Sequence, residues 1–308
     1  MPSTSFLRGE VGLAVASPGL VHEFLDTNRR VVEETLQRIL PLTSDDDGGV
    51  AESMRYTVLA PGKRIRPLIL LAVADLYQAE RSRVLPSACA VELVHACSLI
   101  LDDLPCMDNA ELRRGRPSNH RVHGEATAIL AAFGLLNLAY GLVAGGASVP
   151  DTIRAAVARK LSEALGTLGL IGGQALDLGL AAPRLDLHEL ERIHSRKTGS
   201  LFIASVTIGA RLASAPENEE AALGAFAKNL GLAYQIVDDL LDASGDPSVT
   251  GKDARADRRG NFVTLAGLEG ARRLTGELSE CAMEHLTPLG QRAALLRGLA
   301  LELSGRAR

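Results

Sequence analysis

Two groups of aspartates, each followed by basic residues, are the part of this chain best suited to chemistry. The six acidic residues are Asp102, Asp103, Asp108, Asp238, Asp239 and Asp242. Arg113 and Arg114 follow the first group, and Lys252 follows the second. Carboxylates grouped in this way repel one another unless a cation holds them, and Mg²⁺ suits that role because it binds oxygen ligands together with substrate phosphates. Since Arg and Lys bind phosphates, the pattern predicts a pocket where metal ions activate a diphosphate.

The second group has simple helical geometry. Asp238 and Asp242 are four residues apart and share one face of a helix, whereas Asp239 lies about 100° round from Asp238. Like charges at that spacing destabilise a helix unless a counter-ion is present. A solvated acidic face is the alternative, but the surrounding GLAYQIVDDLLDA is too apolar for one. We therefore interpret this group as a cation site.

The first group has a less regular geometry. Asp102 and Asp108 are six residues apart, about 240° round an ideal helix, so a straight helix would point them away from each other. Pro105 lies between them and would clash with the carbonyl of Leu101. A kink or bulge there would bring Asp108 round to Asp102. Alternatively, Asp108 only caps the next segment.

Basic residues stand where a helix is expected to begin. The stretch PGKRIRP contains Lys63, Arg64 and Arg66, and free amide groups with basic side chains at such an entrance favour an anion. The alternative is an ordinary basic surface cluster. His95 lies seven residues before Asp102, on roughly the same helix face, although a lone histidine on an apolar helix is more often a core residue.

A third basic stretch is HSRKTG, residues 194–199. It could present Lys197 and Thr198 to a phosphate. The alternative is a basic residue placed at a helix C-terminus.

Composition excludes several classes of protein. The 308 residues carry a net charge of −4, which gives no case for a nucleic-acid partner. The four cysteines lack metal-ligand or disulfide spacing, so we expect a reduced, cytoplasmic chain. The N-terminus is too weakly apolar for a secretory signal, and we expect no uncharged apolar run of about 18 residues and no stable membrane insertion.

The periodicity predicts one all-α domain. Aromatic residues make up 3% and Trp is absent, whereas Ala and Leu are abundant, and this mix favours helix. After a loose leader over residues 1–20, we expect a single helical domain over residues 21–308. Helical spacing recurs over residues 21–40, 67–79, 86–104, 125–145, 151–170, 171–180, 186–212, 217–243 and 262–286.

The chain resembles the trans-isoprenyl diphosphate synthases, or polyprenyl synthetases, and among them the bacterial geranylgeranyl diphosphate synthases. The segments that carry the resemblance are GKRIRP (62–67), ELVHACSLILDDLPCMDNAELRRGRPSNH (92–120), GGQALDL (172–178), HSRKTG (194–199) and YQIVDDLLD with GKD (234–253). The resemblance implies a helical bundle around a central cavity, the isoprenoid synthase fold. It also implies a homodimer.

The reaction implied by the resemblance is head-to-tail prenyl transfer. Isopentenyl diphosphate attacks an allylic diphosphate (dimethylallyl, geranyl or farnesyl) while three Mg²⁺ ions, bound by the six aspartates, stabilise the leaving group. The residues implied to bind isopentenyl diphosphate are Gly62, Lys63, Arg66, His95 and Arg114. Those implied to bind the allylic partner are Arg113, Lys197, Thr198, Gln235 and Lys252. Catalysis is assigned to Asp102, Asp103, Asp108, Lys197, Asp238 and Lys252.

The sequence departs from the family pattern at two places. Many members have Gly-Asp where this chain has Ala132-Phe133, and bacterial carotenoid-pathway geranylgeranyl diphosphate synthases share that departure. Past Lys252, the family usually has a Lys-x-Thr, and this chain offers either Arg258 or Arg259 in place of that lysine; Arg259 is included among the expected substrate-binding residues.

Product length is expected to depend on the residues one turn before Asp102. Cys97 and Ser98 are both small, and they can form the floor of the cavity that receives the growing chain. Farnesyl-producing bacterial relatives typically carry an aromatic residue where Cys97 stands. We therefore predict a geranylgeranyl (C20) product, with farnesyl (C15) as the alternative, although Phe133 or residues 168–174 could overrule the floor.

Two other classes of protein share part of this pattern. A class I terpene cyclase also uses an acidic first motif, but its second motif normally mixes Asn, Ser or Thr with Glu, and it has no use for GKRIRP. A regulatory synthase subunit tends to lose acidic residues, whereas this chain retains both groups.

Overall fold

The protein is an assembly of helices with one very short hairpin. The computed structural model describes residues 14–44, 47–146, 148–180, 185–244 and 260–305. Its longer helices are α1 (Pro18–Ile39), α3 (Ile65–Leu76), α4 (Arg81–Asp102), α6 (Glu125–Ala144), α7 (Asp151–Leu165), α10 (Ser200–Leu212), α11 (Glu217–Ser244), α13 (Phe262–His285) and α14 (Ala294–Ser304). The shorter elements are α2 (Val50–Val58), α5 (Asn119–His123), α8 (Leu170–Asp177), α9 (Leu187–His194), the π-helix η2 (Ser195–Gly199) and the 3₁₀-helix η3 (Thr287–Ala293). The predicted all-α fold is confirmed.

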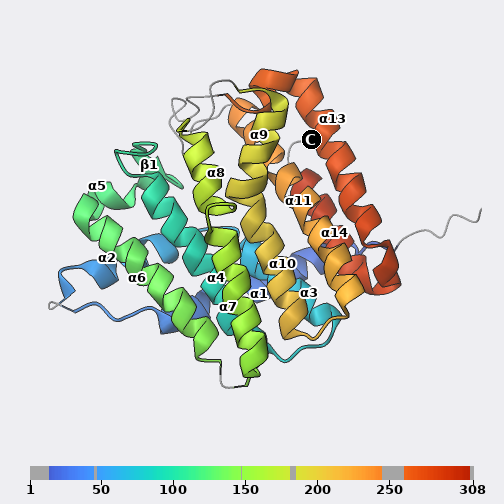
Figure 1. Cartoon of the computed structure of the whole chain (residues 1–308), viewed down its shortest axis with the longest axis horizontal. Coiled ribbons are helices and arrows are strands. Elements are labelled where there is room, and N and C mark those ends of the chain that lie inside the picture. Colours follow the sequence, from blue (N-terminus) through green and yellow to red (C-terminus); the bar gives the residue numbers. More distant parts are fainter. Residues whose placement is uncertain (1–13, 45–46, 147, 181–184, 245–259, 306–308) are drawn as a thin grey trace, which may run out of the picture.

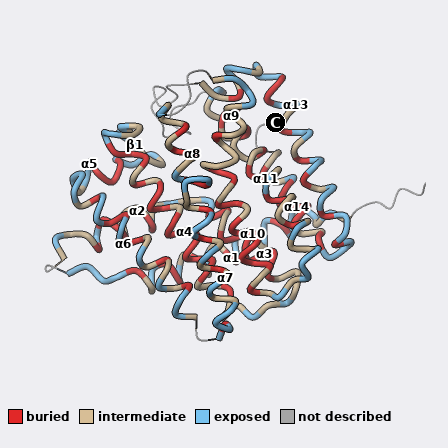
Figure 2. The backbone as a smooth tube through the Cα atoms, in the orientation of Figure 1, coloured by how far each residue is buried: buried red, intermediate tan, exposed pale blue. Residues whose placement is uncertain are grey.

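Helix α10 is the centre of the bundle. It packs against α3, α4, α7 and α11, and nearly all of its side chains are buried. At Gly209 a Cβ would lie only 2.7 Å from the carbonyl oxygen of Leu70, so the glycine lets α10 and α3 approach closely. Figure 2 shows the buried residues concentrated along these inner helices. Because η2 leads directly into α10, residues on η2 are held at one end of a rigid core.

Most predicted segments agree with helices, but residues 186–212, predicted as one segment, divide into α9, the π-helix η2 and α10, and the two ends of the chain also differ. Helix α14 was not predicted, although its buried face packs against α1 and α13. Residues 14–20, assigned to the leader, are bonded to the domain here, since the Ala16 amide donates to the Ala294 carbonyl at 2.9 Å. Arg297 donates to the Ala14 carbonyl at 3.0 Å.

The hairpin is made of β1 (Leu112–Arg113) and β2 (Arg116–Pro117), which pair antiparallel. Its two turn residues, Arg114 and Gly115, both have positive φ, as the tight turn between two short strands requires. Figure 1 shows this hairpin at the same end of the molecule as α8 and α9.

Two helices are long and apolar enough to cross a membrane by length and composition alone, α4 and α6. The expectation that no such run exists is therefore wrong. The apolar window of α4 is 72% buried, as in the core helix of a soluble protein, whereas that of α6 is only 33% buried. Much of the apolar surface of α6 is thus left partly or fully exposed by the described residues.

Candidate active site

The first aspartate group is brought together by the end of a helix. Helix α4 stops at Asp102, and the chain then folds back so that the Asp108 amide donates to the Asp102 carbonyl at 2.9 Å. The kink expected near Pro105 is thus a helix end, because Pro105 cannot continue the helix past Leu101. The two carboxylates interact electrostatically, since the negative charge of Asp108 raises the pKa of Asp102. The alternative, in which Asp108 only caps a following helix, is wrong.

Lys197 lies among these carboxylates. Its Nζ donates to Asp177 at 2.6 Å and lies 3.9 Å from Asp102. Burial raises the pKa of Asp102 to about 6, although Lys197 opposes that shift. Burial also raises the pKa of Asp108. The pKa values of both carboxyls thus stay raised although Lys197 and Arg113 both act to lower them.

The position of Lys197 depends on a close approach of two backbones. At Gly173 of α8, a Cβ would lie 2.7 Å from the Lys197 Cα and even closer to its amide nitrogen. Only glycine allows η2 to lie this close to α8. A π-helix is rare and is often found at functional sites. The HSRKTG stretch is therefore a bulge between α9 and α10, and the alternative of a helix C-terminus is wrong.

Asp103 is turned toward the hairpin. Its Oδ1 accepts from the Nε of Arg113 at 2.9 Å, and the same oxygen also pairs with Arg113 Nη2. The Asp103 side chain is 3% exposed. In this structure Asp103 fixes Arg113, and its predicted role as a metal ligand stays a prediction.

A second, basic cluster lies next to the first. Arg66 Nη1 is 3.3 Å from His95 Nε2, and the Arg66 guanidinium lies 5.2 Å from the centre of the Phe202 ring. Burial, together with Arg66 and Arg114, lowers the pKa of His95 well below its usual value, so the imidazole is uncharged at neutral pH. At Gly62, a Cβ would lie 2.7 Å from Arg114 Nη1. The structure thus gathers four of the five residues predicted to bind isopentenyl diphosphate.

The aspartates of the second group do not all face the same way, and Asp239 faces Gln235 and the start of α13. Asp239 accepts from the Gln235 amide at 3.0 Å and from the Phe262 amide at the start of α13, also at 3.0 Å. Thr198 in turn donates to Gln235 at 3.0 Å. Asp239 therefore positions the predicted allylic-site residues and caps α13. Its metal-ligand role is not tested.

Asp238 and Asp242 lie on a different face of α11 from Asp239. Asp238 raises the pKa of Arg66, which places its charge near the basic cluster, although burial of Arg66 acts more strongly in the opposite direction. Lys252, Arg258 and Arg259 lie outside the described residues, and their contacts stay predictions. Lys63 lies on the loop before α3, and its contact with substrate stays a prediction.

Comparisons with known proteins identify the family. A model of the polyprenyl synthetase family matches residues 48–294. The chain belongs to the polyprenyl synthetase family. A geranylgeranyl diphosphate synthase of Pseudescherichia vulneris is 43% identical over 269 residues, covering 86% of this chain and 86% of that protein. A farnesyl diphosphate synthase of Geobacillus stearothermophilus is 40% identical over 271 residues, covering 86% of this chain and 91% of that protein.

Solved structures give the same family. An apo FPP/GFPP synthase of Zymomonas mobilis has a TM-score of 0.84 and 32% identity, and the match covers 94% of this chain and 100% of that one. The predicted family and the predicted isoprenoid synthase architecture are both confirmed.

The residues of this polyprenyl synthetase fit a hard divalent cation that arrives with a diphosphate. No group of three His, Cys, Asp or Glu side chains converges closely enough to hold a metal within the described ranges. Mg²⁺ does not need such a cage, since it is usually held by one or two carboxylates, waters and substrate phosphates. Asp102 and Asp108 supply such a pair, and the charge on them is only partly balanced by Lys197.

Sequence reasoning missed two residues of this polyprenyl synthetase site. Asp177 holds Lys197, and Gln174, one turn earlier on α8, has a buried amide with no hydrogen-bond partner among the described residues. Both lie in the GGQALDL segment, and their spacing of three residues puts them on one helix face. That spacing was the available signal.

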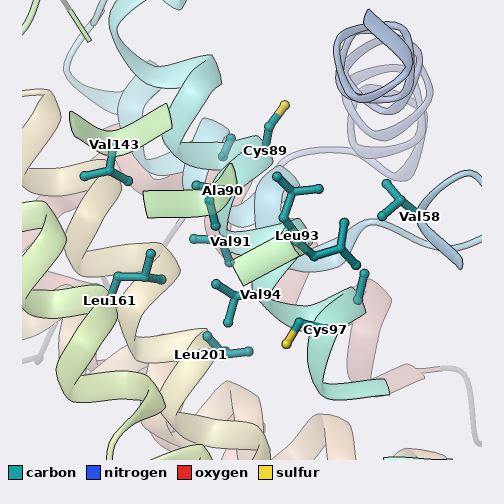
Figure 3. Packing of buried hydrophobic residues seen from close by; sticks show 14 of the residues in the cluster. Val58, Cys89, Ala90, Val91, Leu93, Val94, Cys97, Val143, Leu161 and Leu201 are labelled. Carbon is teal, nitrogen blue, oxygen red and sulfur yellow. The ribbon is translucent and has the colours of Figure 1, made fainter. Parts of the chain in front are cut away.

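The predicted floor residues of the polyprenyl synthetase lie inside the core. Cys97 and Ser98 are buried, and Ser98 donates to the His95 carbonyl at 2.8 Å. Figure 3 shows Cys97 in the same part of the core as Val94 and Leu201. Phe133, by contrast, is 66% exposed on α6, so within this chain it does not block the space beside Cys97.

Proposed function

We propose that this chain is a prenyltransferase that joins isopentenyl diphosphate head-to-tail to an allylic diphosphate, and that its main product is geranylgeranyl diphosphate (C20). The observation that carries the proposal is the pair of adjacent clusters. Asp102, Asp108 and Lys197 form one, and Arg66 with His95 belongs to the other. A cyclase, which takes a single diphosphate substrate, has no need for the second cluster.

The basic cluster suits isopentenyl diphosphate. Arg66, Arg114 and Lys63 supply positive charge, and the uncharged His95 adds a donor that carries no charge of its own. Arg guanidinium groups form paired hydrogen bonds with phosphate oxygens, which fixes orientation as well as affinity. The bound diphosphate would hold the isopentenyl double bond toward the allylic site.

The acidic cluster suits the allylic diphosphate. Lys197 and Arg113 are the cations closest to the carboxylates, and they would neutralise charge on the departing diphosphate as the carbon–oxygen bond breaks. Mg²⁺ held by Asp102 and Asp108 would add Lewis-acid stabilisation of that charge. The isopentenyl double bond then forms the new carbon–carbon bond, and the proton it loses passes to the released diphosphate.

The C20 product is supported by the small side chain at Cys97. Replacing Cys97 by Tyr adds a ring to a position that is buried beside Val94 and Leu201. We expect the main product of the variant to shorten by at least one five-carbon unit, because the growing chain loses the space that it would enter. Mass spectrometry of the dephosphorylated products checks this.

Leu301→Tyr, at an exposed position of α14, is the control for the Cys97 variant and should leave product length unchanged. An unchanged product from a folded Cys97→Tyr variant would show that the floor lies elsewhere.

We propose a homodimer that covers the outer face of α6. The exposed apolar residues of this region are Ile129, Leu130, Phe133, Leu168 and Ile171. Figure 1 shows α6, α7 and α8 next to one another on the same side of the molecule. An apolar helix that is only 33% buried needs a cover, and a second copy of the chain offers a face of the same character. If a second copy covers α6, the high hydropathy of this helix does not require insertion into a membrane.

Placing a charge on that face is expected to separate the two copies. Phe133→Glu would bury a carboxylate in the apolar interface, so we expect the sedimentation mass to fall from that of a dimer to that of a monomer. Leu301→Glu, on an exposed part of α14, should leave the mass unchanged. A wild-type protein that sediments as a monomer would refute the proposal.

A product assay tests the proposed activity. The purified protein is incubated with Mg²⁺, isopentenyl diphosphate and, in turn, dimethylallyl, geranyl and farnesyl diphosphates. A C20 product supports the whole proposal, and a C15 product keeps the enzyme class but moves the floor away from Cys97. No elongation of any primer by folded protein would favour a regulatory subunit or a cyclase.

We also propose a cytoplasmic location. The support is that all four cysteines are free in the structure, two of them buried in the helical core.

A further inference from the structure

The sequence groups Arg64 with its basic neighbours, but the structure turns it away from them. Lys63 and Arg66 flank a residue whose side chain is only 2% exposed. Arg64 also has a left-handed backbone, with φ of 51°. A non-glycine residue adopts this conformation at a cost, and such strain persists where the surroundings fix it. The structure therefore holds Arg64 inward against both its charge and its backbone preference.

The guanidinium of Arg64 ties together three separate parts of the chain. It donates to Glu92 of α4 at 2.9 Å and to Glu33 of α1 at 3.3 Å. It also donates to the carbonyls of Val58 at 2.8 Å and Ala60 at 2.7 Å, at the end of α2 and in the loop that follows. Four acceptors on one side chain leave the loop between α2 and α3 little freedom.

That loop leads into the basic cluster. Lys63 precedes Arg64 directly on the loop, and Arg66 follows two residues later in the first turn of α3. Gly62 lies against the Arg114 guanidinium, and a Cβ there would lie 2.7 Å from Arg114 Nη1 and displace the end of that side chain. A shift of the loop would therefore move Lys63 and Arg66 and would also disturb the hairpin arginine.

Glu92, which accepts a hydrogen bond from Arg64 on this loop, lies on the same helix as His95. The two residues are three apart on α4 and share a helix face. Glu92 is 2% exposed, and its negative charge raises the pKa of both Arg66 and Arg114, although burial of each acts more strongly in the opposite direction. Removing Glu92 would leave several buried cations repelling one another.

We propose that Arg64 and Glu92 form a positioning pair for the isopentenyl diphosphate site, which neither residue contacts. A buried ion pair is weak evidence of added stability, since desolvation offsets much of its attraction, and fixing one arrangement is the better-supported role. This inference rests on the proposed function.

The test compares Arg64→Met, Glu92→Gln and the double variant with Arg297→Met. Arg297 is the matched control, because it is fully buried and donates to three carbonyls, those of Ala14, Leu286 and Gly290, none of which belongs to this loop. We expect the Kd for isopentenyl diphosphate, measured by calorimetry without an allylic partner, to rise about 10- to 100-fold in each single variant. The double variant should rise no further than the worse single variant, since the two residues act as one unit.

Kinetics separate positioning from general damage. We expect KM for isopentenyl diphosphate to rise while KM for the allylic diphosphate stays within about twofold, because the allylic residues lie on η2 and α11. Arg297→Met should lower the melting temperature without changing either KM. If Arg64→Met does not fold, Arg64→Lys keeps the charge but cannot form the four bonds, and it should still weaken isopentenyl binding.

Two results would overturn the positioning role. One is an unchanged Kd for isopentenyl diphosphate in folded Arg64 and Glu92 variants, and the other is an equal rise in both KM values. Failure of the wild-type protein to elongate any primer would instead count against the proposed function, so the two failures are distinguishable.

Discussion

Asp102→Asn is expected to lower kcat/KM about 10³-fold or more while making the metal-free protein more stable at pH 8. The loss of activity follows because Asp102 ends α4 beside Asp108 and Lys197, where charge on the leaving diphosphate must be balanced. An amide keeps the size of the side chain and removes its charge. Initial rates at varied concentrations of both substrates, with saturating Mg²⁺, measure the change.

The stability gain follows from the pKa of Asp102. Burial raises it to about 6, above its value of 3.8 in the unfolded chain. The folded state therefore holds the extra proton between these values, and stability falls as pH rises through that window. Above pH 6 the full cost of the buried charge is present, about 3 kcal/mol from the size of the shift. Asn carries no such cost.

Urea denaturation in EDTA at pH 4.5 and pH 8 measures this effect. The free energy of unfolding of Asp102→Asn relative to wild type should be more favourable at pH 8 than at pH 4.5. Glu163→Gln, an exposed carboxyl on α7, is the control and should show no such dependence. If the variant is less stable at pH 8, then Lys197 and its neighbours stabilise the charged carboxylate and the site does not lack a cation.

Gly173→Ala is expected to cost both stability and activity. The added Cβ would meet the backbone of Lys197, which cannot move aside as a flexible side chain can. Relief requires η2 to shift away from α8, and overpacking of this kind costs about 1–3 kcal/mol. Because Lys197 and Thr198 are on η2, we expect kcat/KM to fall about 10²-fold, as misplacement of about 1 Å can do.

Gly224→Ala is the matched control for this second variant. Gly224 is also within a helix, but no atom lies within 4 Å of its Cβ position. Alanine there should be neutral or stabilising, by about 0.5–1 kcal/mol, because it is the better helix former. Full activity of Gly173→Ala would mean that the position of η2 does not govern catalysis.

Much of the fold could be predicted because it depends on local signals. Helical spacing of apolar residues located α3, α6 and α11, since each helix must bury one face. The spacing of Asp238 and Asp242 likewise put them on one face. Helix α14 was missed, because its buried residues follow only after the irregular turn of η3.

Residue type and spacing alone predicted the site as a set of residues, and only the family resemblance divided it into roles. They predicted that carboxylates, arginines and lysine would gather in a region suited to a diphosphate. Residue type and spacing could not separate Arg64 from Arg66, or Asp239 from Asp238, because the two residues of each pair have the same chemistry. The tertiary structure decided this by supplying Glu92 to Arg64 and the Phe262 amide to Asp239. The role of a buried charged side chain depends on the partner that tertiary packing places beside it. In both cases that partner belongs to a different helix, so spacing within one helix could not reveal it.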